Sequence, residues 1–339
     1  MVVAIQPDNY GRDDASAPRW ARALHAAGHE VRWVDVRRPD IVSQLRGCAG
    51  FMWRHGHLPE HRQIARRLLP VVERELGLAV YPDQKTCWHY DDKLAQAFLL
   101  EALHIPTPQT SVFFDRDQAL EWLSSAQFPL VLKLWSGAGS ENVRLIDTRA
   151  TAVRWIEALF SSGVRSLGDE APGPWPSRWA RIRAAWRLVR RGYPPAPEPA
   201  GLPWEVHRNY VLFQEYLPNN AHDTRITVIG NRAFGFRRWN RDQDFRASGS
   251  GKIDYEHTQI DPAFIRLAFE TTKRLCAQSC AIDGLWRGSE AVVGEVSYTY
   301  VSWAVQHCPG HWDRDLVWHP GHIWPEDAQV EDFLVRLGG

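Results

Sequence analysis

The chain lacks an excess of charge of either sign. Its 339 residues include 40 Lys and Arg residues and 40 Asp and Glu residues, so the formal net charge is zero. A protein without net charge exerts no long-range attraction on nucleic acid or on an anionic membrane. The composition therefore predicts no nucleic-acid partner, and any attraction to an acidic surface must come from a local patch.

Cysteine is scarce. The five cysteines are odd in number and scattered along the chain, which argues against a disulfide framework. Cys276 and Cys280 lie four residues apart, a spacing that predicts a shared helix face. No His or Cys nearby completes a metal site with them, so we expect both to be buried structural thiols.

Long apolar runs are absent as well. None approaches the length of a membrane span, and the apolar start of the chain reaches polar Gln6 too soon for a signal peptide. We therefore expect no transmembrane segment and a location in the reducing cytoplasm.

Over its first eighty residues the chain contains an alternation of strand and helix patterns. Strands are predicted at residues 2–5, 30–36, 49–53 and 78–81, and helices at 18–27 and 59–76. Such alternation predicts a small parallel sheet with helices on its faces. Ligands bind beyond the carboxyl ends of parallel strands, so residues 6–12 and 54–61 are candidate substrate loops; plain solvated connections are the alternative.

The composition changes between residues 163 and 205. Prolines flank a basic helix predicted at residues 177–191, whose apolar positions form one stripe. In one interpretation this helix packs over the body with its basic face in solvent. In the other it docks onto an acidic partner, a phosphorylated substrate or a membrane surface.

Two lysines and a glycine-rich loop begin an ordered set of polar residues. Lys93 opens a predicted helix, and Lys133 ends an apolar strand that is followed by the loop from Gly137 to Ser140. Fixed ammonium groups neutralise phosphate charge, and glycine lets backbone amides approach phosphate oxygens closely. The arrangement therefore suits a nucleotide. It is not a P-loop, because no Gly-Lys-Ser/Thr follows.

The set continues towards the C-terminus. Residues 213–218 form a strand ending in an extended linker that can offer its backbone to an adenine edge, and Asp223 follows as an acid for ribose hydroxyls. Residues 244–252 form a basic loop suited to a γ-phosphate or acyl-phosphate. Asp283 and Glu295 lie on two adjacent predicted strands, where they can share Mg²⁺ ions that also bind phosphate oxygens.

In this order the set resembles the ATP-grasp superfamily, particularly its glutathione-synthase-like and ribosomal-protein-modifying glutamate ligases, over roughly residues 80–300. The resemblance implies an α/β protein with an ATP-grasp fold of two α+β lobes, preceded by a small parallel α/β domain. We therefore predict an N-terminal domain (1–85), a small lobe (86–160), a Pro-, Arg- and Trp-rich helical insertion (161–208) and a large lobe with an aromatic-rich C-terminal segment (209–339).

The resemblance also implies ligands and residue roles. It implies ATP and Mg²⁺ as cofactors, with Mn²⁺ as a substitute, and small-molecule carboxylate and amine substrates. The implied nucleotide contacts are Lys93, Lys133, Gly137, Gly139, Ser140, Glu215, Tyr216, Leu217, Asp223 and Ser248. The implied catalytic residues are Arg246, Lys133 and Arg225, and the implied metal ligands are Asp283, Glu295 and Ser297.

The activity implied is ATP-dependent carboxylate–amine ligation through an acyl-phosphate, with release of ADP and phosphate, in surface-polysaccharide or small-peptide metabolism. Ser297 departs from the family, which usually has Asn at this position, and a hydroxyl is a weaker Mg²⁺ ligand than an amide oxygen. A catalytically degenerate ATP-binding regulator is therefore one alternative. A kinase that phosphorylates its acceptor without forming an amide is another.

A group of three histidines and an aromatic-rich segment near the C-terminus are also candidate functional features. His55, His57 and His61 are spaced like metal ligands, but the Gly and Pro residues between them indicate a loop, and substrate contact is favoured over a metal role. Residues 308–313 are expected to pack aromatic surface around the active-site mouth or a subunit interface, so a homodimer stays open.

Overall fold

The structure is a computed structural model that describes residues 1–7, 16–137, 142–165, 206–242, 244–247 and 250–338. The chain forms two compact units: a first unit of Met1–Pro108 and Leu217–Gly339, and a second unit of Gln109–Tyr216. The chain therefore passes between the units twice, after Pro108 and after Tyr216.

A four-stranded parallel sheet opens the first unit, in the order β2-β1-β3-β4. Its strands are β1 (Val2–Ile5), β2 (Glu30–Trp33), β3 (Gly50–Met52) and β4 (Ala79–Tyr81). The predicted parallel sheet is confirmed, although β2 ends at Trp33 and not at Val36. Beyond β2 the backbone N–H of Val36 donates to the Gln6 side chain (2.7 Å), so this side chain has taken the place of a strand partner.

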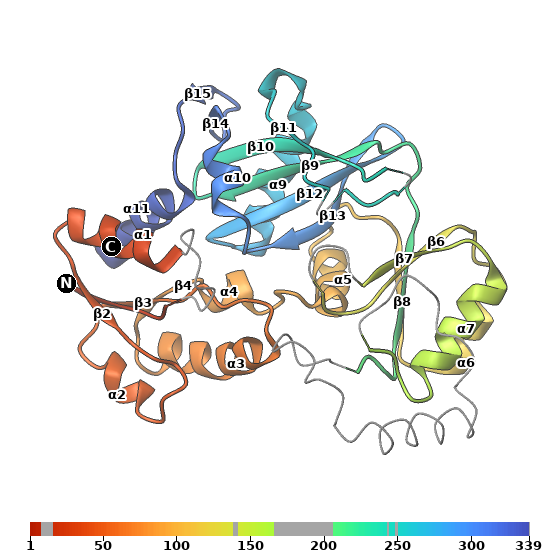
Figure 1. The fold of residues 1–339 in the computed structure, drawn as a ribbon, viewed down its shortest axis with the longest axis horizontal. Helices are drawn as coiled ribbons and strands as arrows, with labels where there is room; N and C mark the ends of the chain where they lie inside the picture. The colour runs from red at the N-terminus through yellow and green to blue at the C-terminus, as the bar shows by residue number, and fades with distance from the viewer. Residues whose placement is uncertain (8–15, 138–141, 166–205, 243, 248–249, 339) are drawn as a thin grey trace, which may run out of the picture. The chain divides into compact units, whose positions relative to one another are not determined.

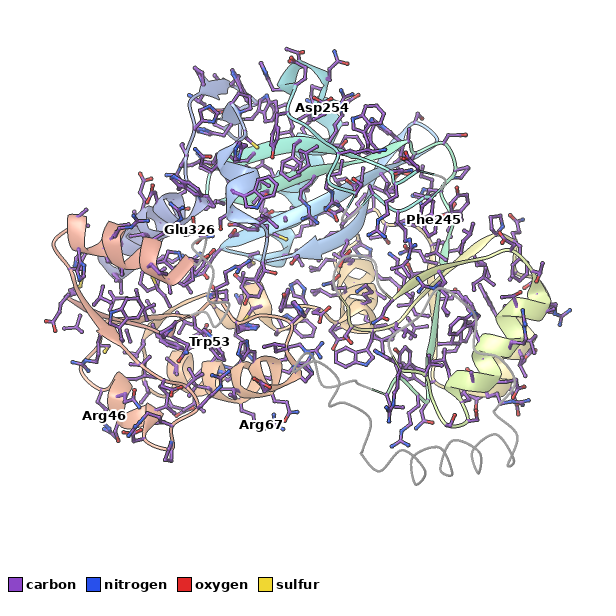
Figure 2. All side chains as sticks on the ribbon, viewed as in Figure 1. Arg46, Trp53, Arg67, Phe245, Asp254 and Glu326 are labelled. Atoms are coloured by element: carbon purple, nitrogen blue, oxygen red, sulfur yellow. The ribbon has the colours of Figure 1, made fainter. Side chains whose placement is uncertain are left out.

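Helices cover both faces of this sheet. Figure 1 shows α1 (Ser16–Ala26) and α11 (Pro325–Gly338) on one face, and α2 (Ile41–Leu45) and α3 (Pro59–Arg74) on the other. Alternate strand residues point to opposite faces. Val3 and Ile5 therefore pack with α1 and α11, whereas Ala4 packs on the α3 side with Trp53, which Figure 2 labels.

A larger, mostly antiparallel sheet forms the rest of the first unit. Its seven strands follow the order β13-β12-β9-β10-β14-β15, with β11 paired to β10. They are β9 (His222–Ile229), β10 (Arg232–Trp239), β11 (Ile253–Asp254), β12 (Ser279–Arg287), β13 (Glu290–Ser297), β14 (Gly310–Trp312) and β15 (Trp318–Pro320). Residues 308–313, singled out in the sequence, thus supply an added strand of this sheet.

The two faces of the seven-stranded sheet have separate cores. One core joins Ile226 and Ile282 to helices α5 (Lys93–Ala102) and α9 (Pro262–Leu275). The other joins Phe234 and Ala281 to α10 (Ser302–Gln306). The short elements α4 (Gln84–Cys87) and η1 (His257–Gln259) complete the first unit.

The prediction that Cys276 and Cys280 share a helix face is wrong. Helix α9 ends at Leu275, so neither cysteine belongs to it. Cys276 follows it in the left-handed conformation (φ 52°), which stops the helix, and its side chain is exposed. Cys280 lies in β12 and is buried as predicted. Residues compatible with a helix continue past Leu275, so the periodic pattern alone overestimates the length of the helix.

The second unit is a four-stranded antiparallel sheet in the order β5-β8-β6-β7 with two helices. Its elements are β5 (Thr110–Phe113), α6 (Arg116–Trp122), β6 (Leu130–Lys133), β7 (Val143–Ile146), α7 (Arg149–Leu159) and β8 (Val211–Glu215). Trp155 and Ile156 of α7 pack against Leu132 and Phe213 of the sheet.

The basic helix predicted at residues 177–191 lies outside the described residues, so both interpretations of it stay predictions. Among the residues that are described, no helix is long and apolar enough to cross a membrane.

Candidate functional site

The first turn of α5 brings one predicted phosphate-binding residue to a predicted metal ligand. Asp92 caps the helix by accepting a hydrogen bond from the backbone N–H of Ala95 (3.0 Å), which sets the position of Lys93. Lys93 is almost fully buried, and its Nζ lies 3.9 Å from Oε1 of Glu295 on β13. Gln96 donates from Nε2 to the carbonyl of Val296 (3.0 Å) and thereby fixes α5 to this strand.

The β12–β13 hairpin gathers the three predicted metal ligands. Asp283 is directly opposite Glu295, and Ser297 is opposite Ala281, so the register confirms that the two predicted strands are adjacent. Cross-strand partners share a face of the sheet, as do residues two apart along one strand. Asp283, Glu295 and Ser297 therefore lie on one face, the face that carries α10.

Two arginines from neighbouring strands hold Asp283. Arg225 of β9 donates through Nε to Oδ1 (2.7 Å) and through Nη2 to Oδ2 (2.8 Å). Arg238 of β10 donates through Nη2 to Oδ2 (2.7 Å) and through Nε to Oδ1 of Asp223 (2.8 Å). Two guanidinium groups thus balance two carboxylates in one buried network, which we call the arginine–aspartate cluster.

The electrostatics of this cluster favour an ionised Asp283. Burial alone would raise the pKa of its carboxyl group, but the charges and hydrogen bonds of Arg225 and Arg238 hold that pKa well below its usual range. The same carboxylates raise the pKa of Arg238. Burial and the neighbouring Asp283 raise the pKa of the coupled Asp223 carboxyl group, so the pKa values of the two aspartates of the cluster are shifted in opposite directions.

Sequence reasoning missed Arg238. It lies opposite Asp223, just as Arg225 lies opposite Asp283, so the cluster follows from the β9–β10 and β9–β12 registers. The signal was available in part: Arg238 follows Asp223 and Arg225 along the chain, and an antiparallel pairing of the two segments would have placed it beside them.

The oxygen donors of the hairpin fit a Mg²⁺ ion that is completed by phosphate. Asp283 Oδ2 accepts two hydrogen bonds from arginine, whereas Oδ1 accepts one and keeps a lone pair. The Glu295 side chain is 44% exposed. The Ser297 hydroxyl donates to the carbonyl of Thr299 (2.8 Å), accepts from the Thr299 N–H (3.2 Å) and keeps one acceptor lone pair. Mg²⁺ commonly binds through one or two carboxylates together with substrate phosphates.

A site made of protein ligands alone is not found. The described residues contain no group of three or more His, Cys, Asp or Glu side chains placed to hold a metal ion. A metal at this hairpin would therefore depend on the phosphate oxygens of a bound nucleotide.

Arg246 lies in the loop that follows β10, which Figure 2 marks with Phe245. Its guanidinium pairs with Asp244, through Nε at 2.9 Å and Nη2 at 2.6 Å from Oδ2. The loop is closed by a backbone hydrogen bond from Arg241 N to the carbonyl of Arg246 (3.1 Å). Ser248, predicted in the same loop, lies outside the described residues.

The remaining predicted residues belong to the second unit or to its border. Lys133 ends β6 opposite Val143. Gly137 has φ 124°, and a Cβ at this residue would lie 2.5 Å from Asn142 Nδ2, so the loop requires glycine there. Gly139 and Ser140 lie outside the described residues.

The predicted adenine linker coincides with a passage between the units. Glu215 ends β8, where its carboxylate accepts from the Gln109 N–H (3.1 Å) and its own N–H donates to the Gln109 carbonyl (2.8 Å). Tyr216 is the last residue of the second unit and Leu217 the next residue of the first. That the residues of both units meet around one triphosphate stays a prediction.

Comparisons with known proteins bear on the fold of both units. No family model matches the chain. The chain is 17% identical to a RimK-domain ATP-grasp protein from Sphaerobacter thermophilus, with a TM-score of 0.54 over 99% of this chain and 100% of that one. It is 14% identical to the ATP-grasp ligase PsnB, which was solved with a minimal precursor, Mg and ADP, with a TM-score of 0.56 over 100% of this chain and 98% of that one.

One curated relative matches a shorter stretch. The chain is 26% identical over 83 residues to the α-aminoadipate–LysW ligase LysX of Saccharolobus solfataricus, which is 24% of this chain. The matched stretch spans 30% of the length of that ligase. The structural likenesses run over nearly the whole chain, so the predicted ATP-grasp architecture is confirmed as the fold of this protein.

Proposed function

We propose that this chain, whose fold is that of the ATP-grasp ligases, is an ADP-forming ligase that joins a carboxylate to an amine. The observation that carries the proposal is the approach of Lys93 to Glu295, with Asp283 facing Glu295 across the hairpin. A buried ammonium group beside a partly exposed carboxylate matches what a magnesium-bound phosphate chain requires, because the lysine binds oxygen and the carboxylate binds metal.

In the proposed complex each predicted contact residue has its own role in nucleotide binding. Lys93 and Lys133 neutralise the phosphates, and Glu215, Tyr216 and Leu217 line the adenine edge. Asp223 binds the ribose through the lone pairs that Arg238 leaves unused. Mg²⁺, held by Glu295 and Asp283, would spread the negative charge that develops on the transferring phosphoryl group.

The reaction has two steps. A substrate carboxylate oxygen attacks the γ-phosphorus, the bond from this phosphorus to the β–γ bridging oxygen breaks, and ADP leaves. The amine then attacks the carbonyl carbon of the acyl-phosphate, the carbon–oxygen bond to phosphate breaks, and the nitrogen loses a proton to give the amide. We assign Arg246 to the transferring phosphoryl group, whereas Arg225 and Arg238 keep Asp283 ionised and oriented.

The substrates are proposed by class. Amino acids and amino or uronic sugars are the first carboxylates and amines to try, in keeping with a role in surface-polysaccharide or small-peptide metabolism in the cytoplasm.

The assay measures ADP release from Mg-ATP by the full-length chain with each pair of compounds. Hydroxylamine traps an acyl-phosphate as a hydroxamate, and mass spectrometry detects the amide. ADP release that survives both Lys133→Ala and Arg246→Ala would contradict these assignments.

A non-catalytic ATP-binding regulator is the second candidate. It is favoured by Ser297 in the place of the amide ligand and by the engagement of both Asp283 oxygens with arginine. Calorimetry would then show Mg-ATP binding while no compound stimulates ADP release. A kinase would release ADP and give a phosphorylated acceptor, with no amide in the mass spectrum.

A further inference from the structure

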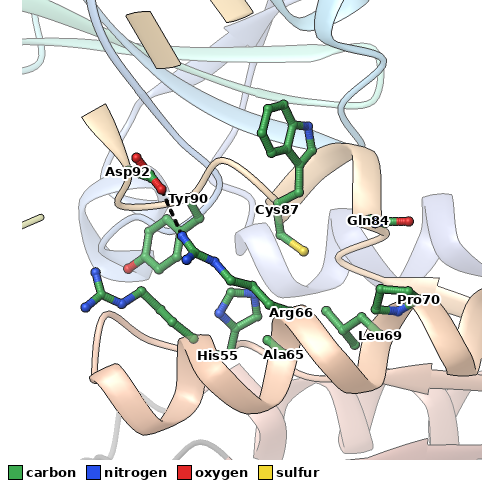
Figure 3. Close-up of a pocket in the computed structure, with 11 residues that line it drawn as sticks. His55, Ala65, Arg66, Leu69, Pro70, Gln84, Cys87, Tyr90 and Asp92 are labelled. Carbon is green, nitrogen blue, oxygen red and sulfur yellow. Dashed lines mark hydrogen bonds and ion pairs between the residues drawn. The ribbon is translucent and has the colours of Figure 1, made fainter. Parts of the chain in front are cut away.

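A cavity of about 330 Å³ lies within the N-terminal part of the first unit. Helix α3 forms one wall with Ala65, Arg66 and Leu69, and α4 and the segment leading into α5 form the others (Figure 3). Its volume falls at the lower end of the range for small-molecule sites, about 300–1,000 Å³. Every lining residue lies between positions 55 and 92, so the first unit alone forms the cavity.

One side chain in the cavity wall has unused hydrogen-bonding capacity. His55 is 3% exposed, and neither of its ring nitrogens has a hydrogen-bond partner among the described residues. Buried polar groups are almost always hydrogen-bonded, and each one left without a partner destabilises the fold. An unpartnered imidazole in the wall of a cavity therefore requires a partner other than the described residues, either water or a bound ligand.

The His55 ring is neutral and held in place. Burial, with a smaller contribution from the electrostatic interaction with His61, lowers its pKa to about 3. A neutral imidazole offers one N–H donor and one acceptor. The ring packs against Tyr90 and Tyr298, with centroid distances of 5.6 and 5.0 Å, and the Tyr298 hydroxyl donates to the His55 carbonyl.

Two arginines, Arg62 and Arg66, and an apolar wall complete the cavity. Arg66 pairs with Asp92 through Nη2 (3.0 Å) and is 45% exposed, so its other N–H groups are available to a second carboxylate. Leu69 and Pro70 supply apolar surface. Burial raises the pKa of Cys87, so its thiol stays protonated and acts as apolar surface too.

We propose that this cavity binds a small organic carboxylate with an apolar body. The carboxylate pairs with Arg66 and accepts the N–H of His55, while the body lies against Leu69 and Pro70. No lining residue of the cavity belongs to the β12–β13 hairpin assigned to the metal.

The bound carboxylate acts on α5 through Asp92. This residue both pairs with Arg66 and caps the helix that begins at Lys93, so a ligand that competes for Arg66 changes the group that positions Lys93. This coupling rests on the proposed function, because it links the cavity to the binding of ATP. The binding of the carboxylate does not rest on it.

The binding experiment uses isothermal titration calorimetry on the full-length chain without nucleotide. The probes are phenylacetate and 4-methylvalerate, with phenylacetamide as the uncharged analogue and acetate as the analogue without an apolar body. We expect saturable binding of the first two at one site per chain, tighter than either analogue. Equal affinity for phenylacetamide, or no saturable binding of any probe, would overturn the proposal.

Two variants locate the site. Arg66→Met keeps the side-chain stem and removes the charge, so phenylacetate should bind at least about tenfold more weakly. Ala65→Phe fills the cavity and should abolish binding. Arg67→Met is the matched control, because Arg67 is exposed on the next position of α3, donates to the Gln63 carbonyl and does not line the cavity. Unchanged affinity in both Arg66→Met and Ala65→Phe would place the ligand elsewhere.

The coupling is measured as the Kd of Mg-ATP with and without saturating phenylacetate. We expect a change of about fivefold or more that disappears in Arg66→Met, and by thermodynamic linkage ATP must change the phenylacetate affinity by the same factor. An unchanged Kd would exclude the coupling. Absence of ATP binding altogether would instead contradict the proposed function and leave the carboxylate site standing.

Discussion

Two buried carboxylates of the first unit have opposite electrostatic surroundings. Asp283, on the seven-stranded sheet, accepts three hydrogen bonds from two arginines. Glu326, at the start of α11 and labelled in Figure 2, accepts hydrogen bonds from the hydroxyls of Ser16 (3.0 Å) and Ser302, and its Oε2 has no partner among the described residues. Burial acts to raise both pKa values, yet that of Asp283 is lowered and that of Glu326 is raised.

The difference shows what two arginine partners add: the pKa of Asp283, bound by Arg225 and Arg238, is lowered, whereas that of Asp223, bound by Arg238, is still raised by burial. Arginine offsets the loss of hydration because its charge and its hydrogen bonds both favour the anion. A hydroxyl offers a hydrogen bond without a charge. Because the buried Arg238 and the partly buried Arg225 lie beside Asp283, the chain keeps an anion at that point of the sheet, next to the partly exposed Glu295.

Removing Arg238 should have the largest effect on stability. Arg238→Met leaves Asp223 and Asp283 buried with one arginine between them, and losing one partner of a buried ion pair typically costs about 3–5 kcal/mol. Urea unfolding followed by circular dichroism measures the change. Arg237→Met is the control, because Arg237 pairs with the less buried Asp254 on the opposite face and should lose about 1 kcal/mol or less. Equal losses in the two variants would contradict the central place given to Arg238.

Removing the charge of Glu295 tests the exposed carboxylate of the same face. Glu295→Gln should fold as the parent does, because this side chain is 44% exposed. ADP release should fall by about 10²-fold or more, comparable to the loss of one group that stabilises developing charge. Glu290→Gln, on the same strand and paired at the surface with Arg287, should leave the rate unchanged. Full activity of Glu295→Gln would remove this residue from the metal site.

Removing Arg225 should destabilise the chain less than removing Arg238. In Arg225→Met the Asp283 carboxylate keeps its hydrogen bond from Arg238, so we expect a loss of about 1–3 kcal/mol in urea unfolding. The acid limb of the stability profile should move to higher pH, because Asp283 loses part of what depresses its pKa. Stability supplied by a depressed carboxyl pKa is present above the unfolded-state value and is lost as pH falls. An unchanged acid limb would show that Arg225 does not set the charge of Asp283.

How much of this could be predicted depends on the range of the interactions. The sequence patterns around Asp283 and Glu295 predicted two adjacent strands, because a hairpin joins segments that are close along the chain. The parallel sheet was predicted from the alternating strand and helix patterns of the first eighty residues. Arg238 was missed because its role arises from pairing of β10 with β9 and of β9 with β12, and a single sequence does not show register. The end of α9 was missed because Cys276 stops the helix by its backbone conformation, which its residue type does not announce.

Glu326→Gln should have the smallest effect and the most informative pH dependence. The folded-state pKa of Glu326 is raised, mainly by burial. Its contribution to stability is therefore fully present below the unfolded-state pKa and is lost as pH rises through the folded-state value. Relative to the parent, Glu326→Gln should gain stability as pH rises from about 4 towards neutrality, by about 1–2 kcal/mol, the scale of burying an uncompensated polar group.

Urea unfolding at a series of pH values measures the gain. Glu331→Gln, on the same helix but 67% exposed, should show almost no such dependence. A Glu326→Gln difference that stays constant with pH would mean that this carboxyl group titrates alike in the folded and unfolded chain, and its contrast with Asp283 would then rest on arginine alone.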